Sequence, residues 1–470
     1  MQKKITIKDN VRFAELSGDF NPMHVDPLEA RRYLYGRPVV HGIHILLWVL
    51  NVWLSGKKKP LKISRLHVDF LRPCGVEEEL LLSICQGDDG TLSSELSSGE
   101  SIVAKMEWKW EPYIDNGSQG CALLKGLPEN PMSCRTLSKD DLELQRGKLQ
   151  LYVDKKLLHS LFPEVDAFLP IWQSAALLAS TRLVGMECPG LNSIYSELDL
   201  SFSAIEQEET LLSYEVTKYD RRFDHVSMGV KSPGMKGTVM AFYRPSPPKQ
   251  PSIEEIKSKV EPGEFIAQRA VIIGGTRGLG EVTAKLLVAG GAAVKISYCR
   301  GKVEADNILC DIETLRGDAE AFRFNVLESD KERLIKIVEE WKPTHLYYFA
   351  TPFIFSSVKG CFSPSLFNKF CDYYVTGFHD TVIPFIKGGL KKIFYPSTIA
   401  IDELPLNMGE YVSAKSAGES LCSFLEKRYD GLVIARPRLP RLDTDQTASL
   451  HYKNNIDPVP EMLKYIKSMS

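Results

Sequence analysis

Residues 13–30 read FAELSGDFNPMHVDPLEA and place an acid and an imidazole, Asp19 and His24, five positions apart. In a regular strand this odd spacing would send the two side chains to opposite faces. A glycine, an asparagine and a proline instead predict a bend that turns both toward one cavity. Taken singly, Asp19 is typical of a helix cap and His24 of a packed histidine. Together they favour acid and base work on one substrate.

The pattern F-x-x-L-S-G-D-x-N-P-M-H resembles the signature of MaoC-like (R)-specific enoyl-thioester hydratases and dehydratases, a hot-dog-fold family. The resemblance implies that Asp19 and His24 hold and activate one water molecule. Adding water across a thioester-conjugated double bond needs a base on the water and a proton returned at the α carbon. Val40-His41-Gly42 is a further match. For His41 and His44 a structural role is expected, with service to the site as the alternative.

The run HGIHILLWVLNVWL that begins at His41 is too short to cross a bilayer and predicts a core helix. At 470 residues the chain is expected to form two to four domains. A formal charge of -2 disfavours a nucleic-acid partner. Without a signal-peptide pattern or a spanning segment, a cytoplasmic location is expected. The ten cysteines are scattered, which predicts reduced thiols and no metal site.

Residues 111–139 and 244–264 are rich in turn formers and predict domain boundaries. The first two segments resemble each other, because His67-Val-Asp-Phe aligns by pattern with Glu197-Leu-Asp-Leu and an apolar helix precedes each. The second copy lacks S-G-D-x-N-P-x-H, so it is expected to be a scaffold and part of the thioester tunnel. The domains expected are a catalytic hot dog over 1–112, a second hot dog over 135–245, a dinucleotide-binding domain over 265–450 and a tail over 451–470.

The segment that begins at Ala270 reads as a short buried strand, a glycine-rich turn and a helix, in that order. Such a turn lets the backbone approach a pyrophosphate at the helix N-terminus, which predicts a Rossmann-type dinucleotide site. The fold class expected is therefore an α+β double hot dog followed by an α/β doubly wound parallel sheet. The turn residues expected to bind cofactor are Gly274, Thr276, Arg277, Gly278, Leu279 and Gly280.

The spacing G-x-x-x-G-x-G resembles the short-chain dehydrogenase/reductase family, whose Y-x-x-x-K is supplied by Tyr411 and Lys415. Spacing by four puts both side chains on one helix face. A lysine cation beside a phenol favours the phenolate, so Tyr411 is expected to be the general acid for reduction. By resemblance, Ser397 orients the substrate carbonyl, with Thr398 as the alternative. Tyr411 and Lys415 are also expected to contact the cofactor.

The second strand, AAVKISYCRG, ends without an acidic residue where a diol-binding Asp would stand, while Arg277 and Arg300 are near enough to meet a ribose phosphate. NADP(H) is therefore expected over NAD(H). The chain departs from the reductase pattern where it has Thr351, Tyr374 and Asn325. Two arginines in a basic loop, Arg438 and Arg441, are candidates for phosphate or carrier acid groups.

The two halves suit one pathway segment, because a 3-hydroxyacyl thioester is the product of a 3-oxoacyl reductase and the substrate of an (R)-specific dehydratase. The sequence therefore predicts a bifunctional acyl-thioester enzyme that uses NADP(H). Its partner would be an acyl-CoA or an acyl carrier protein, and a homo-oligomer is expected. Two alternatives are a reductase of an unrelated carbonyl substrate, and a degraded reductase that serves as a nucleotide- or carrier-binding module.

Overall fold

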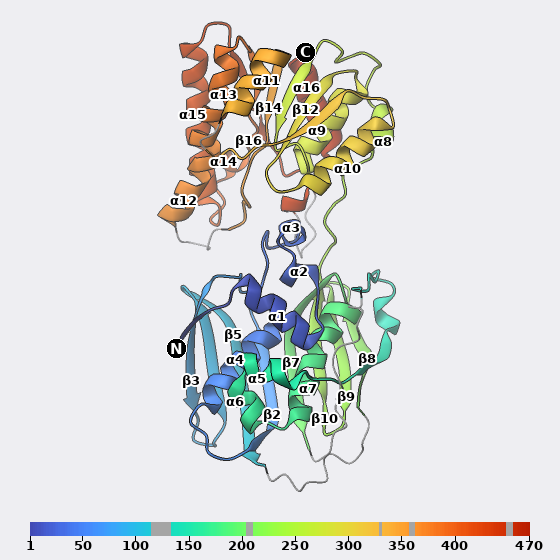
Figure 1. Cartoon of the computed structure of the whole chain (residues 1–470), viewed down its shortest axis with the longest axis vertical. Helices are drawn as coiled ribbons and strands as arrows, with labels where there is room; N and C mark the ends of the chain where they lie inside the picture. Colours follow the sequence, from blue (N-terminus) through green and yellow to red (C-terminus); the bar gives the residue numbers. More distant parts are fainter. Residues whose placement is uncertain (114–132, 204–209, 329–330, 357–361, 448–454) are drawn as a thin grey trace. The chain divides into compact units, whose positions relative to one another are not determined.

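The computed structural model describes residues 1–113, 133–203, 210–328, 331–356, 362–447 and 455–470. The chain divides into two compact units, Met1–Ser246 and Pro247–Ala448 with Lys453–Ser470 (Figure 1). The expected boundary over 111–139 lies largely outside the described residues. In the described part of the chain, no helix combines the length and apolar character needed to cross a membrane.

The first unit is built on one antiparallel sheet of ten described strands. Its order is β1-β3-β4-β5-β2-β7-β10-β9-β8-β6, so each half has five strands and the halves mirror each other about the β2–β7 pair. The strands are β1 (Gln2–Lys4), β2 (Leu61–Phe70), β3 (Glu79–Gln86), β4 (Leu92–Ser98), β5 (Ser101–Pro112), β6 (Arg146–Gln150), β7 (Ser193–Phe202), β8 (Leu211–Asp220), β9 (His225–Ser232) and β10 (Met235–Tyr243).

The two segments that align in sequence are the two central strands of this sheet. Asp69 of β2 pairs with Glu197 of β7, and the antiparallel register runs on to Arg65 and Ser201. Successive residues of a strand point to opposite sides of the sheet. Burial therefore alternates along β2, and Leu66 and other apolar side chains point into the core. The junction therefore joins the halves through backbone hydrogen bonds.

Each half packs one apolar helix against the sheet: α4 (Gly42–Leu54) in the first and α7 (Ile171–Arg182) in the second. Both lie on the same side of the sheet (Figure 1) and their side chains form one hydrophobic core. Almost every residue of α7 is buried, which explains its lack of a polar face. Shorter helices complete the unit: α1 (Ile7–Ser17), α2 (Pro22–Val25), α3 (Pro27–Ala30), α5 (Lys155–Leu161) and α6 (Pro163–Phe168).

The second unit contains a six-stranded parallel sheet in the order β13-β12-β11-β14-β15-β17, which confirms the predicted α/β class. This is the doubly wound order, with its switch point between β11 and β14. Its strands are β11 (Arg269–Ile273), β12 (Ala293–Tyr298), β13 (Ala319–Arg323), β14 (His345–Tyr348), β15 (Lys392–Phe394) and β17 (Val433–Ala435), beside a small pair, β16 (Ser397–Thr398) and β18 (Arg438–Leu439).

Helices cover both faces of this sheet (Figure 1). They are α8 (Ile253–Lys257), α9 (Gly278–Ala289), α10 (Lys302–Glu313), α11 (Glu332–Trp341), α12 (Pro364–Cys371), α13 (Gly377–Lys387), α14 (Ala400–Glu403), α15 (Gly409–Arg428) and α16 (Pro458–Ser468). The residues expected as a tail include α16, whose Val459, Met462 and Ile466 are buried in the same core as α9. These residues are thus part of the second unit.

Candidate active sites

The Asp19–His24 segment is a turn between two helices, as its glycine and proline predict. Helix α1 ends at Gly18, whose φ of 75° lies in the left-handed region that favours glycine. The Asn21 side chain then caps α2 by accepting a hydrogen bond from the Met23 amide at 3.1 Å. His24 lies on α2 directly after this cap. The turn thus presents both side chains on its inner side.

Asp19 and His24 are brought together in a buried site. A carboxylate oxygen of Asp19 and a ring nitrogen of His24 lie within 4.8 Å of each other, a separation that one bridging water can span. Asp19 is 1% exposed and His24 is 9% exposed. Burial raises the pKa of Asp19, while the nearby His24 and a hydrogen bond from Thr181 lower it in part. Burial lowers the pKa of His24, against the opposing effect of Asp19.

The tautomer of His24 follows from its hydrogen bond. Its Nδ1 lies 2.8 Å from the Val39 carbonyl oxygen, which can only accept, so Nδ1 carries the proton. In the neutral ring, Nε2 is therefore an acceptor. His41 stacks on His24 with ring centroids 3.8 Å apart, and its Nε2 donates to the Asp19 carbonyl oxygen at 3.0 Å. His41 thus contacts both residues through its ring.

The second half of the sheet unit also supplies contacts to Asp19. The Thr181 hydroxyl, on α7, donates to Asp19 Oδ2 at 2.7 Å. The side-chain amide of Asn21 donates to the Gly185 carbonyl oxygen at 3.0 Å. A Cβ on Gly185 would lie 2.1 Å from Asp19 Oδ1, so only glycine fits there. The expectation that the second half is a scaffold was therefore incomplete: although it has no counterpart of S-G-D-x-N-P-x-H, it completes the surroundings of Asp19.

Asp19 and His24 line a cavity of about 150 Å³. Its walls come from both halves and are largely apolar, with Ile45, Phe70, Val184, Tyr195 and Phe242 among them. Gly42, the first residue of α4, also lines it, and no side chain caps this helix start. The free amides and positive dipole end of α4 favour an anion there. A Cβ on Gly42 would lie 2.8 Å from the Phe70 ring, which explains the glycine.

The second candidate site is the glycine turn between β11 and α9. Gly274 and Gly278 have φ values of 78° and 53°, and a Cβ on Gly280 would lie 2.2 Å from the Gly274 carbonyl oxygen. The Gly274 amide donates to the Ser297 hydroxyl at 2.9 Å. Helix α9 has no side-chain cap at its start, so its first amides are available to a phosphate. This turn fits the pyrophosphate of a dinucleotide.

The two arginines expected at a ribose phosphate differ in the structure. The Arg277 guanidinium pairs with Asp445 at 2.6 Å, and Asp445 is 6% exposed. Arg277, expected to be near enough to meet a ribose phosphate, is thus paired with a buried carboxylate that would compete with the phosphate for it. Arg300 is exposed, and in the described part of the chain no side chain forms an ion pair with it.

Tyr411 and Lys415 lie one turn apart on α15 and are both buried, as their spacing predicts. Ser397 and Thr398 lie on β16, and the structure separates their roles. The Ser397 hydroxyl donates to Glu419, which is itself held by Arg438 at 2.8 Å. Thr398 is the side chain whose hydrogen bond opposes the rise in the pKa of Tyr411. Thr398, the alternative to Ser397, thus faces the phenol.

The expected depression of the Tyr411 pKa by Lys415 is not present. Burial raises the pKa of Tyr411 to about 12. The Lys415 ammonium donates to the Pro396 carbonyl oxygen at 2.6 Å and lies 4.0 Å from the centroid of the Tyr374 ring. Burial lowers its own pKa to about 7, so the charge that would stabilise a phenolate is itself disfavoured.

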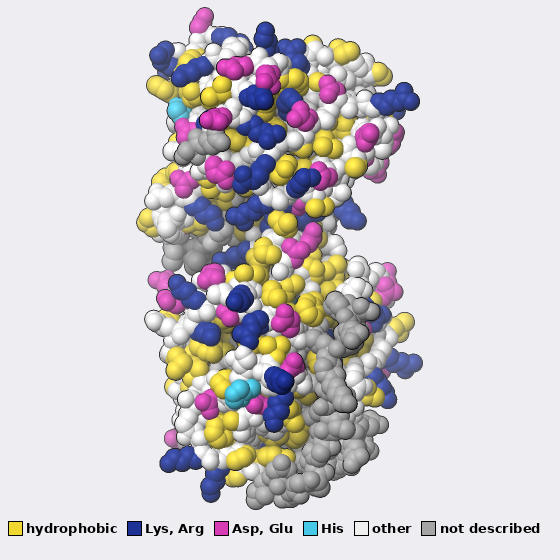
Figure 2. Space-filling view, viewed as in Figure 1, with side chains coloured by type: hydrophobic (Ala, Val, Ile, Leu, Met, Phe, Trp, Pro, Cys, Tyr) yellow, Lys and Arg dark blue, Asp and Glu magenta, His cyan; other side chains and the backbone are white. Residues whose placement is uncertain are grey.

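The two arginines of the basic loop have partners within the chain, and the described cysteines form no disulfide bond. Arg438 pairs with Glu419 and Asp402, and Arg441 donates to Asn455 at 2.8 Å, so neither is free for a carrier phosphate. Cys121 and Cys361 lie outside the described residues, and the other eight cysteines are free thiols. Acidic and basic side chains are interspersed over the surface seen in Figure 2.

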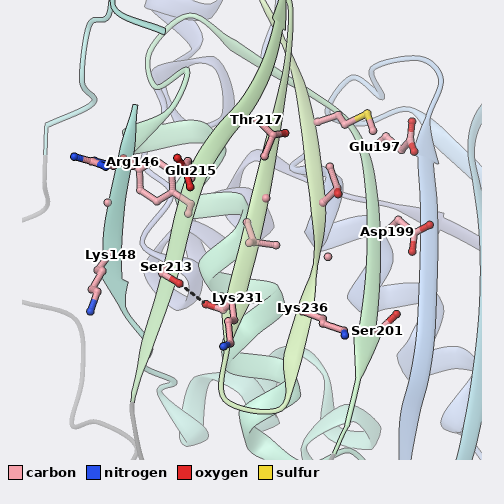
Figure 3. A pocket seen from close by; sticks show the side chains of 17 residues that line it. Arg146, Lys148, Glu197, Asp199, Ser201, Ser213, Glu215, Thr217, Lys231 and Lys236 are labelled. Atoms are coloured by element: carbon pink, nitrogen blue, oxygen red, sulfur yellow. Dashed lines mark hydrogen bonds between the residues drawn. The ribbon is translucent and has the colours of Figure 1, made fainter. Parts of the chain in front are cut away.

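A trough of about 890 Å³ lies on the outer face of the second half of the sheet, away from α7 (Figure 3). Side chains of both signs line it, including Lys148, Lys231, Glu197 and Glu215. The Ser213 hydroxyl there donates to the Lys231 carbonyl oxygen at 3.1 Å. Mixed charge on an open sheet face provides no acid–base pair comparable with Asp19 and His24.

Comparison with known proteins assigns the start of the chain. Residues 1–97 match the family described as the MaoC like domain. The chain is 41% identical over 64 residues to an (R)-specific enoyl-CoA hydratase from Aeromonas caviae, which covers 14% of this chain and 46% of that protein. The N-terminal part of the chain is therefore a MaoC-like domain, with Asp19 and His24 in it.

The chain is also 37% identical over 71 residues to a 3-oxoacyl-[acyl-carrier-protein] reductase from Synechocystis sp., which covers 15% of this chain and 29% of that protein. The chain thus spans less than half the length of either curated relative. Among solved structures, a short-chain dehydrogenase from Burkholderia cenocepacia in complex with NADP is 18% identical, with a TM-score of 0.38 over 43% of this chain and 90% of that one.

Proposed function

We propose that this chain is a bifunctional acyl-thioester enzyme. One site interconverts trans-2-enoyl and (R)-3-hydroxyacyl thioesters, and the other reduces 3-oxoacyl to 3-hydroxyacyl thioesters with NADPH. The observation that carries the proposal is the pair Asp19 and His24 in one buried, largely apolar cavity. The similarity to an enoyl-CoA hydratase and to a 3-oxoacyl reductase supports a shared 3-hydroxyacyl intermediate.

Hydration starts from two proton acceptors. An ionised Asp19 and the unprotonated Nε2 of His24 each accept one O–H of the same water, which leaves an oxygen lone pair for C3 of the enoyl group. The new bond is C3–O, and the thioester oxygen gains negative charge. Amides at the start of α4 stabilise that charge. The proton taken from water is returned to C2, so one water is added and neither residue is consumed.

In the reductase site, the turn 274–280 would hold the cofactor pyrophosphate, and Tyr411 and Lys415 would contact its nicotinamide half. The cofactor supplies a hydride to the carbonyl carbon when it is bound. Tyr411 donates a proton to the carbonyl oxygen, and a phenol whose pKa is about 12 starts fully protonated at neutral pH. Thr398 lies on the Tyr411 side of β16 and orients the same oxygen.

The domain arrangement follows from the mirrored sheet. We infer that the two halves are tandem copies of one hot-dog fold, catalytic over 1–112 and non-catalytic over 135–245, followed by the reductase. The thioester carrier would be CoA or an acyl carrier protein. A homo-oligomer and a cytoplasmic location remain part of the proposal.

A second candidate function is a MaoC-like hydratase joined to a degraded reductase that binds nucleotide without turnover. Two observations favour it: the Lys415 ammonium faces the Tyr374 ring, and Arg277 is paired with Asp445. The intact Tyr411 and the uncapped start of α9 favour the active enzyme.

A coupled assay tests the proposal. Purified chain is given crotonyl-CoA, loss of the conjugated enoyl absorbance is followed, and NADP+ is then added while NADPH is recorded. Hydration followed by NADPH formation supports both sites. Hydration without NADPH, repeated with an acyl carrier protein thioester, supports the second candidate. No hydration of either thioester refutes the hydratase assignment.

A further inference from the structure

The Asp19 carboxylate is held by two different parts of the sheet unit. Its Oδ1 accepts a hydrogen bond from the backbone amide of Asn21 at 3.2 Å, within the same turn. Its Oδ2 accepts from the Thr181 hydroxyl at 2.7 Å, across 162 residues of chain. Both Asp19 and Thr181 are almost fully buried. Removal of the hydroxyl would therefore take away a buried hydrogen bond to the carboxylate.

Three residues of the second half contact the turn that carries Asp19, namely Thr181, Gly185 and Tyr152. Gly185, one turn further along the chain, lies against Oδ1 so closely that a Cβ would be 2.1 Å away. Thr181 has two heavy atoms on Cβ, which restricts its side-chain rotamer on a helix. The Tyr152 hydroxyl, also from the second half, donates to the Ser17 carbonyl oxygen at 2.9 Å and secures the end of α1.

The second half also contributes groups that lower the pKa of Asp19. A hydrogen bond from a hydroxyl to a carboxylate favours the ionised form, which opposes the effect of burial. Next to Thr181, the Arg182 guanidinium is buried over the Tyr152 ring, 4.2 Å from its centroid, and its charge also favours ionised Asp19. Each contribution comes from α7, which has no acid–histidine pair of its own.

We propose that Thr181 is a positioning residue for the hydration chemistry, which makes the second half of the sheet unit a required part of the site. The inference rests on the proposed hydratase function. Thr181 holds one carboxylate oxygen of Asp19 in place for the bridging water, and its hydrogen bond favours the ionised form. Its sequence context, LLASTRLV, has the character of a core helix, which is why the residue type alone does not reveal the role.

The test compares crotonyl-CoA hydration by the wild-type chain, Thr181→Val and Thr181→Ser. Valine keeps the shape and removes the hydroxyl, whereas serine keeps the hydroxyl. We expect kcat to fall about 10- to 100-fold in Thr181→Val with KM changed less than about threefold, because one hydrogen bond to a reacting group is lost. Thr181→Ser is expected to restore most of kcat. The acid limb of the kcat–pH profile should move to higher pH in Thr181→Val only.

Ser174→Ala is the matched control, because Ser174 is a buried hydroxyl on the same helix with no hydrogen-bond partner among the described side chains. It should keep wild-type kcat. Wild-type kcat in Thr181→Val, or an equal loss in Thr181→Ser, would overturn the inference. Thermal unfolding of each variant checks that it is folded, and Thr181→Ala replaces Thr181→Val should the latter fail to fold.

If the wild-type chain hydrates no enoyl thioester, the proposed function is wrong. NMR of carboxyl-labelled aspartate in the same variants separates that failure from a failure of the inferred effect of Thr181 on Asp19. A higher Asp19 pKa in Thr181→Val than in the wild type supports this effect, and an unchanged Asp19 pKa overturns it.

Discussion

The Lys415 ammonium lies over the face of the Tyr374 ring, with 4.0 Å between Nζ and the ring centroid. The Tyr395 ring is close on another side, at 4.8 Å. Tyr374, one of the departures from the reductase pattern, thus forms an aromatic wall beside Lys415. Cation–π contacts and the Pro396 carbonyl oxygen offset part of the burial cost of the charge. The chemistry proposed for Tyr411 therefore depends on how Lys415 is protonated.

The protonation of Lys415 can be measured directly. Its pKa of about 7 predicts that the Cε resonance of one lysine titrates near neutral pH in 13C-labelled protein. Tyr374→Leu removes the ring face and should lower this pKa further, whereas Tyr374→Phe keeps the ring and should leave it nearly unchanged. A Lys415 resonance that titrates near 10 would contradict the assignment, and Lys415→Met identifies the signal.

The lowered pKa of Lys415 also predicts how the stability of the fold depends on pH. Lys415 has a pKa of about 7 in the folded chain, against an ordinary 10.5. Between these values the unfolded chain binds more protons, so stability rises with pH from about 7 to 10, and the full burial cost is present below 7. Lys415→Met should raise the melting temperature at pH 6 and have a much smaller effect at pH 10. Equal shifts at both pH values would show that Lys415 is charged throughout.

Removal of the Asp19 carboxylate should abolish hydration. Asp19→Asn keeps the side-chain size and removes a proton acceptor, and we expect kcat for crotonyl-CoA to fall by about 10² to 10⁴. The enoyl absorbance assay measures this loss. Asp26→Asn is the control, because Asp26 caps α3 through its side chain and asparagine caps equally well. A comparable loss in the control, or reduced NADPH turnover in Asp19→Asn, would indicate general damage.

The two candidate hydroxyls of the reductase are separable by substitution. Thr398 faces Tyr411, whereas the Ser397 hydroxyl is bound to Glu419. Thr398→Ala should lower the rate of NADPH oxidation with acetoacetyl-CoA about 10²-fold, and Ser397→Ala should lower it less than about tenfold. Hydration by both variants should match the wild type. The reverse order of effects would restore Ser397 as the orienting hydroxyl.

Cofactor choice depends on which arginine reaches the ribose phosphate. Arg300→Gln should weaken NADP+ binding about tenfold and leave NAD+ binding unchanged, since only NADP+ carries the extra phosphate. Asp445→Asn releases Arg277 from its ion pair and should tighten NADP+ binding. Calorimetric titration of both cofactors measures each effect. Equal affinity of the wild-type chain for NADP+ and NAD+ would refute the expected preference.

Local patterns were enough to predict much of this protein. Gly18, Asn21 and Pro22 predicted the turn that carries Asp19 and His24, because each of these three residue types has a strong backbone or capping preference. Strand, glycine turn and helix in sequence predicted the parallel sheet and its dinucleotide turn. The four-residue spacing of Tyr411 and Lys415 predicted their common helix face, since helical neighbours repeat at that interval.

The tertiary structure alone decided the surroundings of these residues. Thr181 reaches Asp19 across 162 residues, a relation that no local spacing encodes. Likewise, Lys415 is surrounded by Tyr374, Tyr395 and Pro396 only after folding. The resulting burial of Lys415 lowers its pKa, an effect that the Y-x-x-x-K motif does not reveal. Backbone geometry and helix periodicity are local, whereas desolvation and long-range hydrogen bonds depend on which distant side chains pack together. The sequence by itself therefore determined which groups could react, and the tertiary structure determined their charge states and partners.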